Sequence, residues 1–102
     1  MSEIVRCDDQ TIVKPGKNIV ASMAQEFRKE LLPLVTEDSK ELVVDLTDVT
    51  MIDSIGIGIL VATFNSISKY GGKLTVTNVC KDIYNLLKTM RLDQHFEVRM
   101  VQ

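Results

Sequence analysis

Between residues 41 and 100 the sequence alternates short β-rich runs with stretches of helical periodicity, and this alternation constrains the fold most strongly. The predicted strands are at 41–46, 73–77 and 96–100, and the predicted helices are at 54–70 and 81–90. The first strand is almost continuously apolar, which favours burial on both faces. Strands that alternate with short helices favour parallel neighbours joined by right-handed crossovers.

The first third of the chain carries weaker signals. Two β-rich runs, "EIVRC" and "TIV", flank the polar residues 8–10, which predicts a hairpin that ends at Pro15-Gly16. Apolar residues then recur every three or four positions from 19 to 35, which predicts an amphipathic helix with Pro33 near its end. The element order is therefore β-β-α-β-α-β-α-β, and the hairpin makes the predicted sheet mixed.

The size and composition of the chain indicate one globular domain over residues 1–102. Of its 102 residues, 45% are hydrophobic and 25% are charged, and the net charge is −2. A nucleic-acid binder usually carries a basic excess, which this chain lacks. No apolar run approaches 18 residues and the N-terminus does not resemble a secretory signal, so we expect a cytoplasmic protein without membrane insertion. Cys7 and Cys80 are expected to be buried, reduced thiols.

The turn between the strand at 41–46 and the helix at 54–70 has an unusual composition. It reads Asp53-Ser54 and is followed at once by Gly56 and Gly58, although glycine costs a helix roughly 0.5–1 kcal/mol relative to alanine. Ser54 stands where an N-cap residue is expected. The glycines indicate either close packing of the helix or a surface kept bare around the serine hydroxyl for an incoming protein or phosphate.

Enzymatic and nucleotide-binding motifs are absent from the sequence. The "GIG" of the turn lacks the third glycine of a dinucleotide fingerprint, and the later "GGK" lacks the first glycine of a P-loop. His95 is the only histidine and is expected at the surface or a sheet edge, without a catalytic partner. Neither cysteine has metal-ligand spacing. We therefore predict no catalytic residue, metal or cofactor.

Over residues 41–98 the sequence resembles the STAS domain of bacterial anti-sigma factor antagonists. The resemblance rests on the apolar strand, a "DSxGxG" turn, a "GGK" after the next helix, and a final "RL" followed by phenylalanine. In this chain those features are Leu42 to Leu46, Asp53-Ser54-Ile55-Gly56-Ile57-Gly58, Gly71-Gly72-Lys73-Leu74, and Arg91-Leu92 with Phe96. The resemblance implies an α/β STAS-like domain with helices packed mainly on one face of a mixed sheet.

The resemblance also implies a phosphorylation switch. In such proteins the serine after the aspartate is phosphorylated by a GHKL-type serine kinase that doubles as an anti-sigma factor, and a PP2C-type phosphatase reverses the modification. Ser54 is then the phosphosite, with Asp53, Ile55, Gly56 and Gly58 as its neighbourhood. The unmodified protein is expected to bind its partner, and phosphorylation beside Asp53 is expected to release it.

Helical spacing places the expected partner interface on the face of the helix that begins at Ser54. Its predicted members are Ile55, Ile59, Thr63 and Ser66. The chain departs from the family pattern in two places, because Ile55 stands where serine or threonine is frequent, and "GKNI" at 16–19 lacks the usual acidic residues. An alternative is a constitutive STAS subunit of a larger complex, such as a lipid-transport ABC or stress-signalling assembly, in which Ser54 is not modified.

Overall fold

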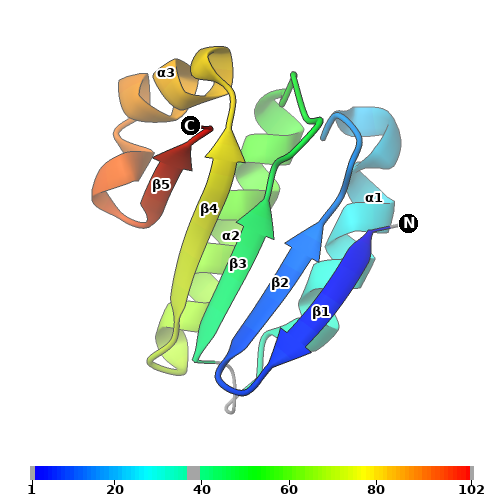
Figure 1. The fold of residues 1–102 in the computed structure, drawn as a ribbon, viewed down its shortest axis with the longest axis vertical. Helices are drawn as coiled ribbons and strands as arrows, with labels where there is room; N and C mark the ends of the chain where they lie inside the picture. The colour runs from blue at the N-terminus through cyan, green and yellow to red at the C-terminus, as the bar shows by residue number, and fades with distance from the viewer. Residues whose placement is uncertain (1, 37–39, 102) are drawn as a thin grey trace.

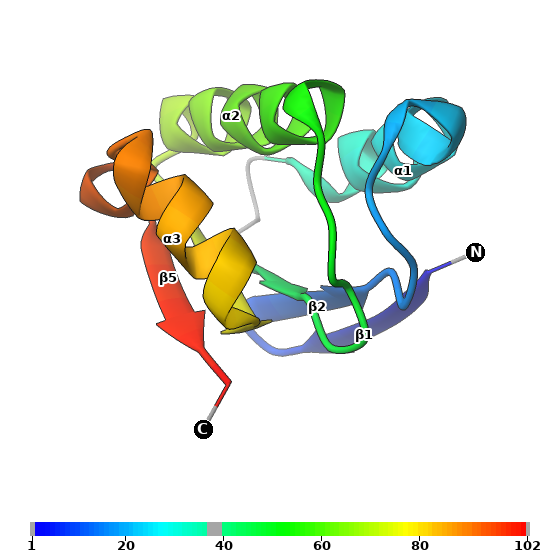
Figure 2. The same ribbon diagram turned by 90° about the horizontal axis from the view of Figure 1, so that it is seen from above.

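The computed structural model describes residues 2–36 and 40–101, which form a five-stranded sheet with three α-helices over one face (Figures 1 and 2). The elements are β1 (Glu3–Cys7), β2 (Gln10–Lys14), α1 (Ala21–Leu31), η1 (Leu32–Leu34), β3 (Glu41–Asp45), α2 (Ser54–Lys69), β4 (Lys73–Val79), α3 (Lys81–Thr89), η2 (Leu92–Gln94) and β5 (Glu97–Met100). The predicted element order is confirmed, and so are the mixed sheet and the placement of the helices on one face.

The strands lie in the order β1-β2-β3-β4-β5. Strand β1 pairs with β2 antiparallel through a tight turn at Asp8, whose φ is 44°, and all the other neighbours are parallel. Each parallel connection therefore crosses over through a helix on the same side, and the carboxyl ends of β2, β3 and β4 share one edge. Helices α1 and α2 both begin at this edge, at the top of Figure 1.

The core lies between the sheet and the three helices. Its members are apolar side chains that alternate along the strands and recur on one stripe of each helix. They include Val13, Ile19, Phe27, Leu31, Leu42, Val44, Leu46, Ile57, Leu60, Ile67, Leu74, Val76, Ile83 and Leu87. The described part of the chain contains no helix long and apolar enough to cross a membrane.

Helix α2 ends where the glycine pair predicts. Gly71 adopts φ 77°, a left-handed conformation that glycine tolerates without penalty. The Gly71 N–H donates to the carbonyl of Ser68 at 3.1 Å, and the Gly72 N–H donates to the carbonyl of Ile67 at 3.0 Å. These two bonds satisfy carbonyls that the helix end leaves unpaired, in the pattern of a Schellman motif.

Helix α1 is shorter than the sequence pattern predicts. It begins at Ala21 rather than 19, because Ile19 forms a parallel bridge with Ile52 instead of entering the helix. It ends at Leu31, and Pro33 lies in the short η1 turn that follows. The predicted position of Pro33 near the helix end is therefore confirmed.

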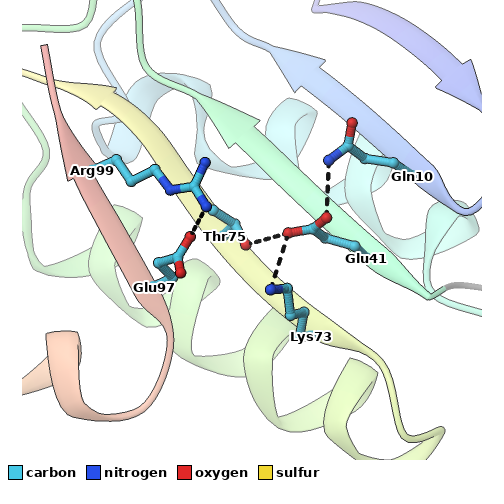
Figure 3. Close-up of polar contacts among 6 residues, drawn as sticks. All are labelled: Gln10, Glu41, Lys73, Thr75, Glu97 and Arg99. Atoms are coloured by element: carbon cyan, nitrogen blue, oxygen red, sulfur yellow. Dashed lines mark hydrogen bonds and ion pairs between the residues drawn. The ribbon is translucent and has the colours of Figure 1, made fainter. Parts of the chain in front are cut away.

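In the described part of the chain no helix lies over the other face of the sheet (Figure 2), and the side chains of Gln10, Glu41 and Thr75 meet there (Figure 3). On this open face Val43 is still buried, because it lies between its register partners Ile12 and Thr75 on the two flanking strands. The prediction that the β3 run is buried on both faces thus holds for the side chains, although helices cover only one of them. The expectation of two buried thiols is wrong for Cys7, which is exposed on the edge strand β1; Cys80 is half-buried.

Candidate functional site

The start of α2 is built from two loops that the sequence separates by about thirty positions. The Ile19 N–H donates to the Met51 carbonyl at 3.1 Å, and the Asp53 N–H donates to the Ile19 carbonyl at 3.2 Å. These bonds place the loop that precedes α1 beside the loop that precedes α2. A movement of the turn at Asp53 therefore also moves the loop that leads into α1.

The side chain of Asn18 also joins these two loops. Its side-chain Oδ1 accepts from the Thr50 N–H at 2.8 Å, from the Thr50 hydroxyl at 3.2 Å and from the Met51 N–H at 3.1 Å. The sequence analysis noted Asn18 only as part of "GKNI" and did not predict this structural role. An asparagine after Pro-Gly is a turn signal, but nothing local in the sequence indicates its partners in the other loop.

Asp53 caps α2, whereas the sequence placed the N-cap at Ser54. The Asp53 Oδ1 accepts from the N–H groups of Ile55 at 3.1 Å and Gly56 at 3.0 Å, while its backbone is extended at φ −93° and ψ −177°. Its other oxygen, Oδ2, accepts from the N–H of Ala21 at 2.8 Å. Ala21 is the first residue of α1, so one carboxylate holds the first turns of both helices.

The pKa of the Asp53 carboxyl is lowered from its usual value. The largest cause is the Gly56 N–H, followed by the Ala21 N–H, and these hydrogen bonds outweigh desolvation, which acts in the opposite direction. Hydrogen bonds donated to a carboxylate favour its charged form. Asp53 is therefore a fixed negative charge at neutral pH, beside the Ser54 hydroxyl.

Ser54 occupies the first helical position of α2 and is exposed. Within residues 2–36 and 40–101, its side chain makes no hydrogen bond, because Asp53 supplies the cap. Two large apolar side chains near it also face solvent, with Met51 57% and Ile55 51% exposed. The structure thus presents a free hydroxyl among apolar and acidic groups.

The two glycines of the turn have different roles. A Cβ on Gly56 would lie 2.4 Å from the Ile19 carbonyl oxygen and 2.8 Å from Cγ2 of Ile52, so only glycine fits between α2 and the neighbouring loop. Gly56 is therefore explained by close packing and not by a need to bare the hydroxyl. A Cβ on Gly58 would meet nothing within 4 Å, and this residue is exposed.

The predicted interface residues do not all share one exposed face. Ile55 is exposed, and Ile59 and Ser66 are half-buried, but Thr63 is only 7% exposed and is wrongly placed by the helical spacing. The Thr63 hydroxyl donates to the Ile59 carbonyl at 2.8 Å, four residues back in the helix. Ala62, which the prediction omitted, is exposed instead.

Polar side chains outside this turn form no metal site in the described residues. His95 is exposed, as predicted, and its ring centroid is 5.9 Å from that of Phe64. Asp45 accepts hydrogen bonds from Thr47 and Asn78. The described residues contain no group of three or more His, Cys, Asp or Glu side chains that could hold a metal ion.

Comparison with known proteins identifies the family of this chain. A family model of the STAS domain matches residues 2–101. The chain belongs to the STAS domain family. The resemblance noted from the sequence is therefore confirmed. Over 63 residues this STAS domain is 36% identical to the anti-sigma-B factor antagonist of Bacillus subtilis (strain 168), an alignment that covers 62% of this chain and 57% of that protein. The matched part thus spans little more than half of the relative's length.

Solved structures of other proteins share the fold. A crystal structure of a candidate anti-sigma factor antagonist from Thermotoga maritima superimposes with a TM-score of 0.89 at 24% identity, and covers 96% of this chain and 85% of that one. The phosphorylated form of the Bacillus cell fate determinant SpoIIAA gives a TM-score of 0.75 at 8% identity, over 96% of this chain and 90% of that one. At these identities the likeness establishes the STAS fold.

Proposed function

We propose that this STAS domain is a protein-interaction switch controlled by phosphorylation of Ser54. The unmodified domain binds a partner through the start of α2, and phosphorylation releases the partner. The partner is an anti-sigma factor or related effector that is also a GHKL-type serine kinase, and a PP2C-type phosphatase resets the switch. The domain itself catalyses no reaction in this proposal and works in the cytoplasm.

The observation that carries the proposal is that Asp53, and not Ser54, provides the cap of α2. Asp53 caps both helices, so the exposed Ser54 hydroxyl has no structural task among the described residues. A kinase can therefore modify this hydroxyl without dismantling a cap. The relatedness to an anti-sigma-B factor antagonist supports the same function.

The effect of the phosphate follows from charge. It adds about −1.5 to −2 charges at pH 7. Helix N-termini usually stabilise such an anion through their free N–H groups, but here Asp53 already occupies the N–H groups of Ile55 and Gly56. The phosphate therefore stands beside a carboxylate without those donors, and the start of α2 becomes strongly negative. A hundredfold loss of partner affinity requires only about 2.7 kcal/mol.

The proposal is tested by the intact mass of the protein purified from its own cells. Wild type is compared with Ser54→Ala and with Ser68→Ala, which removes another exposed serine of α2. We expect the mass of one phosphoryl group on wild type and on the Ser68 variant, and none on the Ser54 variant. A protein without this added mass under all growth conditions contradicts the switch and favours a constitutive STAS subunit.

A further inference from the structure

A small groove runs between α1 and α2 beside the Ser54 turn. Its volume is about 270 Å³, and its lining residues are Arg28, Ile55, Gly58, Ile59 and Ala62. Pockets for small molecules and cofactors usually measure roughly 300–1,000 Å³, so this groove suits a single side chain. Ile55 and Ile59 give it an apolar wall, and Gly58 leaves it open because it has no side chain.

Arg28 is the charged residue of the groove. It is exposed on α1 and forms no ion pair with any residue in the described ranges 2–36 and 40–101. Asp53, the acid at the start of α2, is already held by three backbone N–H groups. A second exposed cation, Lys17, precedes Asn18 in the loop that is fastened to Thr50 and Met51.

The direction of the switch fixes the charge of the occupant, and this step rests on the proposed function. A phosphate on Ser54 attracts a basic partner group and repels an acidic one. Release on phosphorylation therefore requires an acidic or neutral group in the partner, and an unpaired guanidinium favours a carboxylate. We propose that the groove receives one apolar side chain of the partner protein, next to a partner carboxylate that pairs with Arg28.

The test uses two short synthetic helical peptides of identical sequence, except that glutamates in one replace lysines in the other on both sides of a central leucine. Binding to the full chain is followed by NMR through the amide signals of Ile55, Gly58 and Ala62. The variant is Arg28→Glu, and the matched control is Lys29→Glu, which changes the next exposed residue of α1 outside the groove. Thermal unfolding of both variants verifies that they remain folded.

We expect the glutamate peptide to shift these three signals in wild type and in the Lys29 variant. Its affinity should fall about tenfold or more in Arg28→Glu, equivalent to about 1.4 kcal/mol or more, and should also fall in Ser54→Glu. The proposal is overturned if the lysine peptide binds wild type as well as the glutamate peptide, if Arg28→Glu leaves the affinity unchanged, or if neither peptide shifts the groove signals.

Failure of this proposal is distinguishable from failure of the phosphorylation switch. If the protein binds the glutamate peptide but is never phosphorylated, the docking of an acidic partner group beside Arg28 stands and the phosphorylation switch fails. A protein that is phosphorylated on Ser54 but does not discriminate between the peptides retains the switch, and its partner then docks by other chemistry.

Discussion

The carboxylates of Asp53 and Glu41 each gather three donors, and these donors are of different kinds. Among the described residues, all the donors to Asp53, at the start of α2, are backbone N–H groups. Glu41, on the open face of the sheet, is approached only by side chains: Gln10 Nε2 at 2.9 Å, the Thr75 hydroxyl at 2.6 Å, and Lys73 Nζ at 3.7 Å (Figure 3).

The difference lies in how far each set of donors can adapt. Backbone N–H groups have fixed directions and cannot become acceptors, so the Asp53 arrangement demands two carboxylate oxygens in fixed places. A threonine hydroxyl can rotate and can also accept, and lysine and glutamine side chains can turn to water. The start of α2 is therefore rigid and intolerant of change, whereas the polar cover of the open face is adjustable.

Addition of one methyl group at the start of α2 gives the largest expected effect. Gly56→Ala places a carbon 2.4 Å from the Ile19 carbonyl oxygen, so the two loops must separate. We expect a loss of roughly 1–3 kcal/mol in the free energy of unfolding, measured by urea denaturation. The control Gly58→Ala meets nothing within 4 Å and should gain about 0.5–1 kcal/mol. Equal effects of the two substitutions would contradict the packing role of Gly56.

Replacement of Asp53 by its neutral isostere tests the shared cap. Asp53→Asn keeps an oxygen for the N–H groups of Ile55 and Gly56, but turns an NH₂ group toward the N–H of Ala21, where two donors then face each other. We expect lower thermal stability and faster amide hydrogen exchange in the first turn of α1, with the first turn of α2 still protected. Unchanged exchange at the start of α1 is the outcome that contradicts a cap shared by both helices.

The same substitution on the open face should be nearly silent. Glu41→Gln keeps an acceptor for Gln10, and its NH₂ group can donate to the hydroxyl of Thr75, a residue that is 1% exposed. That hydroxyl then accepts instead of donating. Only the ion pair with exposed Lys73 is lost, so we expect a change within about 0.5–1 kcal/mol by urea denaturation. A loss as large as that of Asp53→Asn would remove the contrast between the two regions.

Acid should weaken both regions, and the direction follows from the pKa values. Hydrogen bonding lowers the pKa of Asp53, mainly through the Gly56 N–H, and of Glu41, mainly through the Thr75 hydroxyl. A lowered folded-state pKa contributes stability above the unfolded pKa, and this stability is lost as the pH falls through the folded value. We expect the melting temperature to drop between about pH 5 and pH 2. Asp53→Asn and Glu41→Gln should each reduce that drop, and an unchanged pH profile in both contradicts the assignment.

Much of the fold could be predicted because its signals are local. Helical stripes, the alternation in β4 and the glycine pair after α2 each act within a few residues, and they specify element types and order. The start of α1 could not be predicted, because Ile19 prefers a bridge to Ile52, and no local pattern encodes a contact across that separation. The burial of Val43 was predicted from the continuous apolar run of β3, but the neighbours that bury it, Ile12 and Thr75 on two other strands, could not be.

The sequence indicates where the candidate site lies but not which residues contact one another within it. The acid, hydroxyl and glycines single out this turn as a candidate site, and that assignment stays a prediction. Composition alone could not assign the cap, because serine and aspartate are both good N-caps. The role of Gly56 and the contribution of Asn18 both depend on the loop before α1. Thr63 was misplaced because helical spacing groups residues on one stripe but does not say which part of that stripe the neighbouring elements bury.

The most direct test of the central claim compares the stabilities of Ser54→Ala and Asp53→Ala by thermal unfolding at pH 7. The account holds that Asp53 caps both helices and that the Ser54 hydroxyl has no structural task. The free energy of unfolding of the unphosphorylated Ser54 variant should then equal that of wild type within about 0.5 kcal/mol, while the Asp53 variant should have a clearly lower melting temperature. A Ser54 variant as destabilised as the Asp53 variant would show that the serine is a structural cap, and would contradict its availability as a switch.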